Sequence, residues 1–318
     1  MPVPRSPGYP DYSYKGPGDP GTAWIPIVFS GKLLEKFYAK ATMTNITTTD
    51  YIGEIKKQGD TVVIRTTPDI TIRDYKRGGT LILEYPDSPA IELTVNRAKY
   101  FNFAMDDIDV HMTDMNWLDK YADDAAQQMK VVIDKEFFAD IIVYADPDNQ
   151  GSNAGKESHL FDLGAPGAPL TLNKDNILDY IVDCGTVLDE QNCPDEDRWI
   201  ILPPAVFNLI NKSDLKDASF AGTDKSILLT GGFTGKMIDR FYIYESNLLF
   251  RVTEGADAGA WYLPFGRKGS IVAATVFQKV EKYRPQNTFA DAMKGLAVYD
   301  WGVVYPSHFG FMFGKVQV

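Results

Sequence analysis

The feature that most constrains the fold of this 318-residue sequence is one long stretch of helical periodicity. Between residues 114 and 144, apolar side chains recur three or four positions apart from Leu118 through Met129 and Phe137 to Tyr144. This spacing predicts an amphipathic helix. Its 31 residues would extend about 46 Å, whereas a globular helix averages about 11–12 residues. A heptad counted from Leu118 meets Glu136, so a plain helix is favoured over a coiled coil.

The N-terminal region has a different character. Residues 1–22 contain six of the 19 prolines, and no hydrophobic period is present. Two interpretations remain open, an extended arm that becomes ordered on another surface and a frayed terminus. Ser30 is a suitable N-cap for a short predicted helix from Gly31 to about Thr42.

The pattern of residues 53–104 predicts a long β-hairpin. Alternating or β-branched apolar residues indicate strands around residues 62–64, 70–73, 81–84 and 91–95. Between the middle two, Lys76 and Arg77 precede Gly78 and Gly79, which favours a tight turn with positive charge at its tip. An isolated two-stranded hairpin is marginally stable in water. We therefore expect this hairpin to pack on another subunit.

The remainder of the chain predicts a mixed α/β region. Helices are expected at 176–188 and 205–211, with a polar loop at 213–225. Strands are expected at 199–202, 237–244, 248–252 and 269–277, and further apolar or mixed segments follow at 291–298 and 301–305.

Composition narrows the class of protein. The 32 Lys and Arg residues against 43 Asp and Glu residues give a net charge of −11. This argues against a high-affinity nucleic-acid binder, which needs a basic surface. Cys184 and Cys193 do not form a secreted disulfide framework, so a reducing compartment is expected. The apolar run at 24–29 is too short for a membrane span, and no signal peptide is recognised.

No pattern specifies an active site, so we expect no catalytic residue, no cofactor and no metal. His111, His159 and His308 lack ligand spacing. The segment 231–236 fails as a phosphate-binding loop because Thr230 stands where the first Gly is required. The segment Asp146–Glu157 partly fits a calcium loop, but glycine and proline interrupt the helix that should follow. A turn that ends the long helix is the favoured interpretation, and calcium binding remains the alternative.

Several stretches together indicate a family. They are TAWIPIVFSGKLLEKFYAKATMTNITTTDYIGEIKKQGDTVVI, IELTVNRAKYFNFAMDDID, RWIILPP, DRFYIYESN and VEKYRPQNTFADAMKGLAVYDWGVVYP. In this order they run from residue 22 to residue 306. The sequence resembles the major capsid protein of tailed double-stranded DNA bacteriophages, which has the Hong Kong 97-like shell fold.

The resemblance implies an α+β fold with an N-terminal arm, an extended β-hairpin loop, a long spine helix in a peripheral domain, and an axial α/β domain. The implied boundaries are 1–50 for the arm and short helix, 51–107 for the extended loop, 108–170 for the peripheral domain, 171–269 for the axial domain, and 270–318 for returning strands of the peripheral domain.

The resemblance also implies a structural function and no enzymatic one. Pentamers and hexamers would assemble into an icosahedral shell around double-stranded DNA, without sequence-specific DNA binding or a membrane. A portal and a separate scaffolding protein are the expected partners. The chain would lie in the virion capsid after assembly in the host cytoplasm. An encapsulin-like compartment that holds cargo enzymes is the alternative.

Individual residues receive roles from the same resemblance. Lys76, Arg77, Gly78 and Gly79 would form assembly contacts at the tip of the extended loop. Leu118, Met129 and Phe137 would pack the spine helix. Some family members join a loop lysine covalently to an asparagine of a neighbour. We expect no such link between Lys76 and Asn287.

Overall fold

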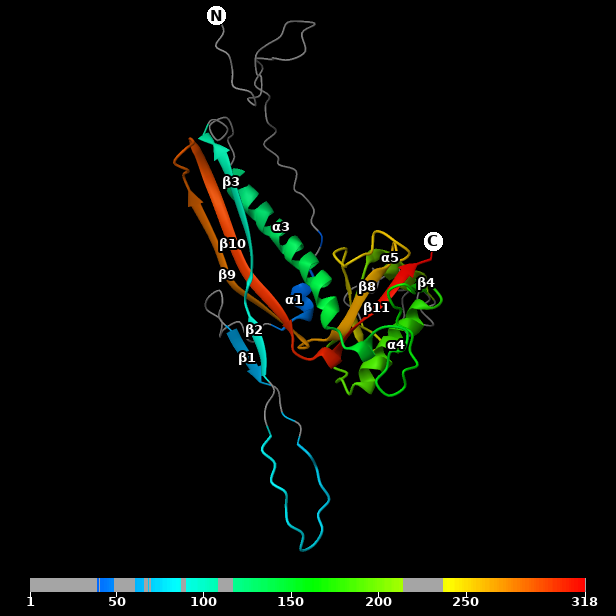
Figure 1. Cartoon of the computed structure of the whole chain (residues 1–318). Helices are drawn as coiled ribbons and strands as arrows, with labels where there is room; N and C mark the ends of the chain where they lie inside the picture. Colours follow the sequence, from blue (N-terminus) through cyan, green and yellow to red (C-terminus); the bar gives the residue numbers. More distant parts are fainter. Residues whose placement is uncertain are drawn as a thin grey trace, which may run out of the picture.

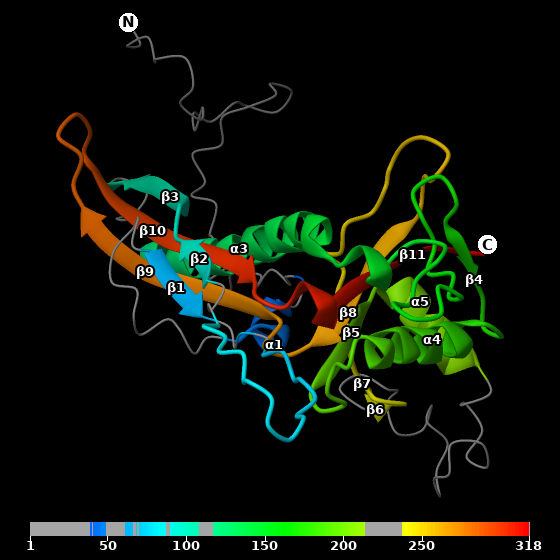
Figure 2. The same cartoon turned by 60° about the horizontal axis from the view of Figure 1, so that its bottom comes forward.

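A computed structural model describes residues 39, 41–48, 61–65, 68, 70–86, 90–107, 117–213 and 237–317. Figure 1 shows that these residues form an elongated lobe built around a long helix and a second, rounder lobe. A loop of residues 70–86 extends beyond both lobes in Figures 1 and 2.

The elongated lobe contains an antiparallel three-stranded sheet in the order β3–β10–β9. Its strands are β3 (Arg97–Asp106), β10 (Ala290–Val303) and β9 (Ile271–Tyr283). Helix α3 (Trp117–Asp140) runs along one face of this sheet (Figure 1). β1 (Thr61–Arg65) and β2 (Ala90–Thr94) form a separate antiparallel pair at the root of the projecting loop.

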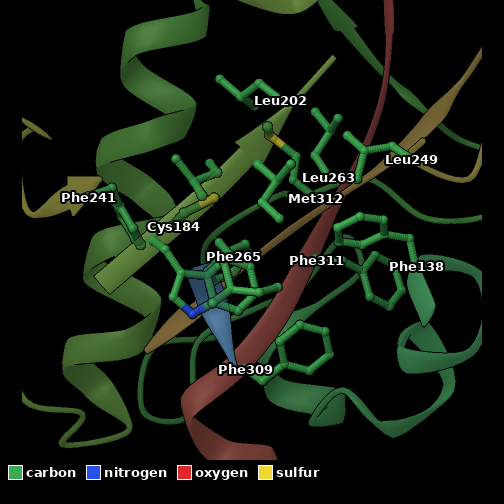
Figure 3. Close-up of a cluster of buried hydrophobic side chains, with 14 of the residues drawn as sticks. Phe138, Cys184, Leu202, Phe241, Leu249, Leu263, Phe265, Phe309, Phe311 and Met312 are labelled. Atoms are coloured by element: carbon green, nitrogen blue, oxygen red, sulfur yellow. The ribbon is translucent and has the colours of Figure 1, made fainter. Parts of the chain in front are cut away.

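The rounder lobe contains a mixed six-stranded sheet in the order β4–β11–β8–β5–β7–β6. The strands are β4 (Leu170–Leu172), β11 (Phe309–Val316), β8 (Trp261–Arg267), β5 (Arg198–Leu202), β7 (Phe241–Glu245) and β6 (Met237–Ile238). Helices α4 (Ile177–Glu190) and α5 (Pro204–Lys212) pack beside it (Figure 2). Their apolar faces and the sheet form the core seen in Figure 3, where Cys184, Phe241, Leu263, Phe265 and Met312 lie together.

Four short helical elements complete the described chain. They are α1 (Met43–Ile46) and the 3₁₀ helices η2 (Ile141–Tyr144), η3 (Pro147–Asn149) and η5 (Pro306–His308). Asp134 of α3 caps α1 from a distance, because its carboxylate accepts the N–H groups of Thr42 (2.6 Å) and Met43 (3.2 Å). Burial raises the pKa of Asp134. The two hydrogen bonds lower it, but the effect of burial is larger, so the pKa is raised overall. This buried carboxylate fastens the N-terminal end of the described chain to the long helix.

The long predicted helix is largely confirmed, but its C-terminal end is wrong. The α-helix ends at Asp140, and residues 141–144 form η2. The sequence there is Ile-Ile-Val-Tyr, and three successive β-branched residues disfavour a further α-helical turn. A tighter 3₁₀ turn is common at such ends. Residues 114–116 lie outside the described part of the chain.

Several strand predictions also require correction. Residues 70–73 and 81–84 have strand-like alternation but form no strand, since β1–β2 pairing ends at Arg65↔Ala90. Residues 248–252 contribute one isolated bridge, Arg251↔Trp261, in place of the predicted strand. Conversely, β3, β8 and β11 were not predicted. Pro264 in β8 and the glycines of β11 obscure the strand pattern.

The sheets divide the chain differently from the predicted domain boundaries. Residues 97–106, assigned to the extended loop, are β3 of the three-stranded sheet. The segment 270–318, assigned to one domain, contributes β9 and β10 to that sheet but β11 to the six-stranded sheet. Strand pairing decides these memberships, whereas the predicted boundaries followed from the resemblance to capsid proteins.

Some predicted elements cannot be compared. Most of the helix 31–42 and most of the polar loop 213–225 lie outside the described residues, as does the segment 231–236. The last two residues of that predicted helix, Ala41 and Thr42, are described and are not helical. The helices predicted at 176–188 and 205–211 are confirmed as α4 and α5.

The Asp134 cap yields a stability prediction. Asp134→Ala leaves two backbone N–H groups without their acceptor, and we expect a loss of about 1–3 kcal/mol in the free energy of unfolding. Asp134→Asn keeps one side-chain oxygen and should lose less. Denaturant titration of both variants measures the difference. Equal stability of Asp134→Ala and the wild type would show that the cap does not stabilise the fold.

Candidate assembly surface

The loop of residues 70–86 ends in the predicted turn. The N–H of Gly79 donates to the carbonyl oxygen of Lys76 at 2.9 Å, and Gly78 has a φ of +80°. That backbone conformation favours glycine because a Cβ would be strained there. The structure therefore places Lys76, Arg77, Gly78 and Gly79 together at the exposed tip of the loop, farthest from β1 and β2 (Figure 1).

The loop exposes apolar side chains that the sequence analysis did not single out. Seven large apolar residues on it are between 63% and 91% exposed, namely Ile70, Ile72, Tyr75, Leu81, Ile82, Leu83 and Tyr85. Single exposed apolar residues are normal on a protein surface, but a large contiguous group marks an interaction site. The signal was present in the sequence as isoleucine, leucine and tyrosine in the two segments beside the turn.

Polar contacts across the loop are weak. Thr71 Oγ1 donates to Glu84 at 3.2 Å, and the Arg73 guanidinium lies 3.9 Å from the same carboxylate. Exposed ion pairs of this kind contribute about 0–1 kcal/mol. These contacts connect the two arms of the loop without shielding its apolar side chains from water.

The root of the loop is held by a small hydrophobic cluster. Ile64 of β1 and Leu93 of β2 are buried, together with Val95, against β9 and β10. The contacting residues of those strands include Val272 and Val298. This packing attaches the β1–β2 pair to the elongated lobe, while residues 70–86 extend beyond it.

Arg97 adds ion pairs to the hydrophobic contacts near the root of the loop. It is the first residue of β3, and its guanidinium contacts Asp140 (2.7 Å) and Glu136 (3.3 Å) of α3 and Asp300 (3.2 Å) of β10. The guanidinium carbon also lies 4.1 Å from the centre of the Trp301 ring. Burial lowers the pKa of Arg97, but these carboxylates outweigh that effect and raise it. One side chain thus joins the loop exit, the long helix and the sheet.

The carboxylates of this network have further partners. Asp300 accepts the N–H of Asn96 at 3.1 Å, and Asp140 accepts the indole N–H of Trp301 at 2.8 Å. Glu136 lies 3.0 Å from the ammonium group of Lys99. Burial raises the pKa of Glu136, but its bonds from Lys99, Tyr299 and Arg97 lower it overall. Sequence reasoning missed the network because its members are up to 204 positions apart.

The three residues predicted to pack the spine helix have different environments. Phe137 is fully buried and meets Phe138 and Trp301 edge to face. Met129 is half-buried on α3. Leu118 lies in the first turn of α3, and its side chain is outside the described part.

The residues considered for chemistry do not converge. Over the described ranges, no group of three His, Cys, Asp or Glu residues could hold a metal ion. Asp146 caps the start of η3 by accepting the N–H of Asp148 at 3.0 Å, two residues after η2 ends at Tyr144. Cys184 and Cys193 are buried free thiols, and burial raises the pKa of both. His111 lies outside the described residues.

The helices placed by the structure are all too short or too polar to cross a membrane.

Comparison with known proteins identifies the family. Residues 90–310 match the model of a family described as phage capsid protein, which covers more than half of the chain. The chain belongs to the phage capsid protein family. No curated protein sequence is similar enough to this capsid protein to count as a match.

Solved structures share its fold. A chain from Mycobacterium phage Che8 has a TM-score of 0.71 and 22% identity, with 91% of this capsid protein and 97% of that chain covered. The capsid structure of the cyanophage P-SCSP1u gives 0.67 and 13% identity, covering 91% and 92%. The mature capsid of bacteriophage PhiM1 gives 0.63 and 16% identity, covering 91% of each chain. The predicted α+β capsid fold of Hong Kong 97-like type is therefore confirmed, and the chain is a major capsid shell protein.

The packing of the spine helix can be tested by substitution. Phe137→Asp buries an unpaired charge, so we expect loss of soluble folded protein. Met129→Asp places the charge at a half-buried position and should be tolerated better. Val132→Asp on the same helix, at a side chain that is 49% exposed, is the control. Soluble yield and thermal unfolding measure the effect, and equal yields for Phe137→Asp and Val132→Asp would contradict the assignment.

Proposed function

We propose that this capsid protein assembles as pentamers and hexamers into an icosahedral shell that encloses phage double-stranded DNA. The observation that carries the proposal is the loop of residues 70–86, whose apolar side chains have no cover in the described chain. In a shell, each loop lies across a neighbouring subunit and buries these side chains. One repeated contact of this kind can generate a closed symmetric assembly.

The proposal assigns a role to each part of the chain. Residues 1–50 act as an arm on the shell surface, and the tip residues Lys76 to Gly79 contact a neighbour. Residues 171–269 meet their copies around the five- and six-fold axes. The Arg97 network supports this assignment because it holds the root of the loop at a defined angle to α3 and β10.

Partners follow from the same function. A portal and a separate scaffolding protein would take part in assembly, which would occur in the host cytoplasm. The net charge of −11 suits a wall that does not bind the packaged DNA tightly. The family match to phage capsid proteins favours a virion shell over an encapsulin-like compartment.

Substitutions in the loop test the assembly function. Ile72→Asp combined with Leu83→Asp places charges where apolar contacts are needed, and so we expect loss of shells. Lys76→Glu combined with Arg77→Glu should weaken assembly through the tip. Both pairs are exposed, so thermal unfolding of the unassembled chain should remain unchanged. Electron microscopy and sedimentation give the readout.

A conservative pair provides the control for this experiment. Ile72→Leu combined with Leu83→Ile keeps apolar area and should form shells of normal size. Normal shells from the Asp pair would refute the role of the apolar loop surface. If the wild-type chain forms no closed particle even with its scaffolding protein, the shell function itself is wrong. A ladder of covalent multimers on a denaturing gel would contradict the expected absence of a Lys76 cross-link.

A further inference from the structure

The three-stranded sheet of the elongated lobe has an open edge along β9. One side of β9 pairs with β10, which lies between β9 and β3. On the other side of β9, the described chain contributes a single bridge, Thr48↔Val272, near the start of the strand. Figures 1 and 2 show β9 at the border of the lobe. Within the described chain, the outward backbone N–H and C=O groups of residues 279–283 therefore have no partner strand.

This part of the edge carries one apolar residue between opposite charges. Val280 is 59% exposed, and Lys279 and Lys282 are exposed as well. Glu281 contacts the ammonium group of Lys279 on its own strand and that of Lys294 on β10, the latter at 3.0 Å. Bonds from these two lysines lower the pKa of Glu281, so its carboxylate is ionised at neutral pH.

An apolar row crosses the sheet and ends at Val280. Register places Gly295 of β10 between Phe101 of β3 and Val280 of β9. The Phe101 ring lies over Gly295, because a Cβ on that glycine would overlap the ring. Phe103, two residues further along β3, meets Tyr121 of α3 edge to face, so this row is on the face covered by α3. Its last member, Val280, nevertheless stays exposed at the edge of the sheet.

A second copy of β9 can extend the sheet with matched charges. A two-fold axis perpendicular to the sheet pairs a strand antiparallel with its copy, and residues equally far from the axis on either side lie opposite each other. With Val280 on the axis, Lys279 of each copy lies opposite Glu281 of the other. Val280 then meets its own copy, and the apolar row continues across both subunits.

The neighbouring registers place like charges opposite each other. An axis at Lys279, Glu281 or Lys282 brings that residue against its own copy, and an axis at Tyr283 brings Lys282 against Arg284. Like charges directly opposite are destabilising. Charged residues on an edge strand deter pairing with other chains. Of the five axis positions from 279 to 283, position 280 alone avoids this repulsion, so the charge order favours a copy of the same chain in one register.

We propose that the outer edge of β9 pairs antiparallel with β9 of a second copy across a two-fold axis at Val280, which joins the three-stranded sheets of two subunits into one. Backbone hydrogen bonds and the Val280 contact supply the attraction, and the two Lys279–Glu281 pairs fix the register. In a shell of pentamers and hexamers, this contact connects subunits of neighbouring capsomers. That placement rests on the proposed shell function, whereas the contact itself can be measured with or without a shell.

Disulfide formation in the full chain tests the position of the axis. Val280→Cys places two thiols directly opposite each other, at the Cα separation of about 4.5–5.5 Å that an antiparallel pair has and a disulfide accepts. We expect mild oxidation to give a dimer on a non-reducing denaturing gel, with the link mapped to residue 280 of both copies. The unsubstituted chain gives the background from Cys184 and Cys193, which are buried.

Lys282→Cys is the matched control on the same strand. With the axis at Val280, residue 282 and its copy are four positions out of register, or about 14 Å apart, which is beyond the reach of a disulfide. This variant should therefore give no dimer above background. Equal dimer yields from Val280→Cys and Lys282→Cys would overturn the proposal. Both positions are exposed, so thermal unfolding of the reduced variants should match that of the unsubstituted chain.

Charge substitutions in the Val280→Cys background test the register. Lys279→Glu puts two carboxylates opposite each other and Glu281→Lys puts two ammonium groups opposite each other, so each should lower the disulfide yield about fivefold. Combining the two restores opposite charges between the copies. Because Glu281→Lys alone and the combination disturb the contact with Lys294 equally, the difference between their yields reports the contact between copies. No loss in the single variants, or no recovery in the combination, would overturn the proposal.

The same samples separate this contact from the shell function. Normal particles without Val280→Cys dimers would refute the contact and leave the shell function intact. Val280→Cys dimers from a chain that forms no particle, even with its scaffolding protein, would support the contact and refute the shell. A chain that gives neither dimers nor particles would refute both.

Discussion

The arrangement of the elongated lobe depends on Arg97. One guanidinium contacts two carboxylates of α3 and one of β10 while its own backbone begins β3. Planar, five-donor geometry allows these contacts to coexist, and a lysine at this position could not reproduce them. Because Asp300 also accepts the N–H of Asn96, the chain leaving β2 is held at the same point. One partly buried charge network thus joins the start of β3 to α3 and β10.

The packing at the root of the loop bears on how residues 70–86 expose their apolar side chains. A flexible loop that exposes seven large apolar side chains would collapse onto its own subunit or aggregate. Here the buried cluster around Ile64 and Leu93 holds the base of the loop. The turn at Gly78 reverses the chain, so that it runs back towards β2. The apolar side chains of residues 70–86 therefore lie outside both hydrophobic core clusters of the described chain.

The N-terminal part of the described chain is also attached through a few specific contacts. Asp134 holds α1 to the long helix, and Thr48 pairs with Val272 at the start of β9. The described residues 41–48 are therefore attached to both α3 and β9.

The sequence by itself determined the long helix, the α4 and α5 helices and the turn at Gly78 and Gly79, because each depends on periodicity or on conformational freedom within a few residues. The order of its segments also indicated the capsid family. Only the tertiary structure decided that residues 70–86 form no strand, that β11 joins the six-stranded sheet, and that Arg97 meets Asp300. The β11 pairing and the Arg97 contact depend on partners far away in the chain, which local spacing does not identify.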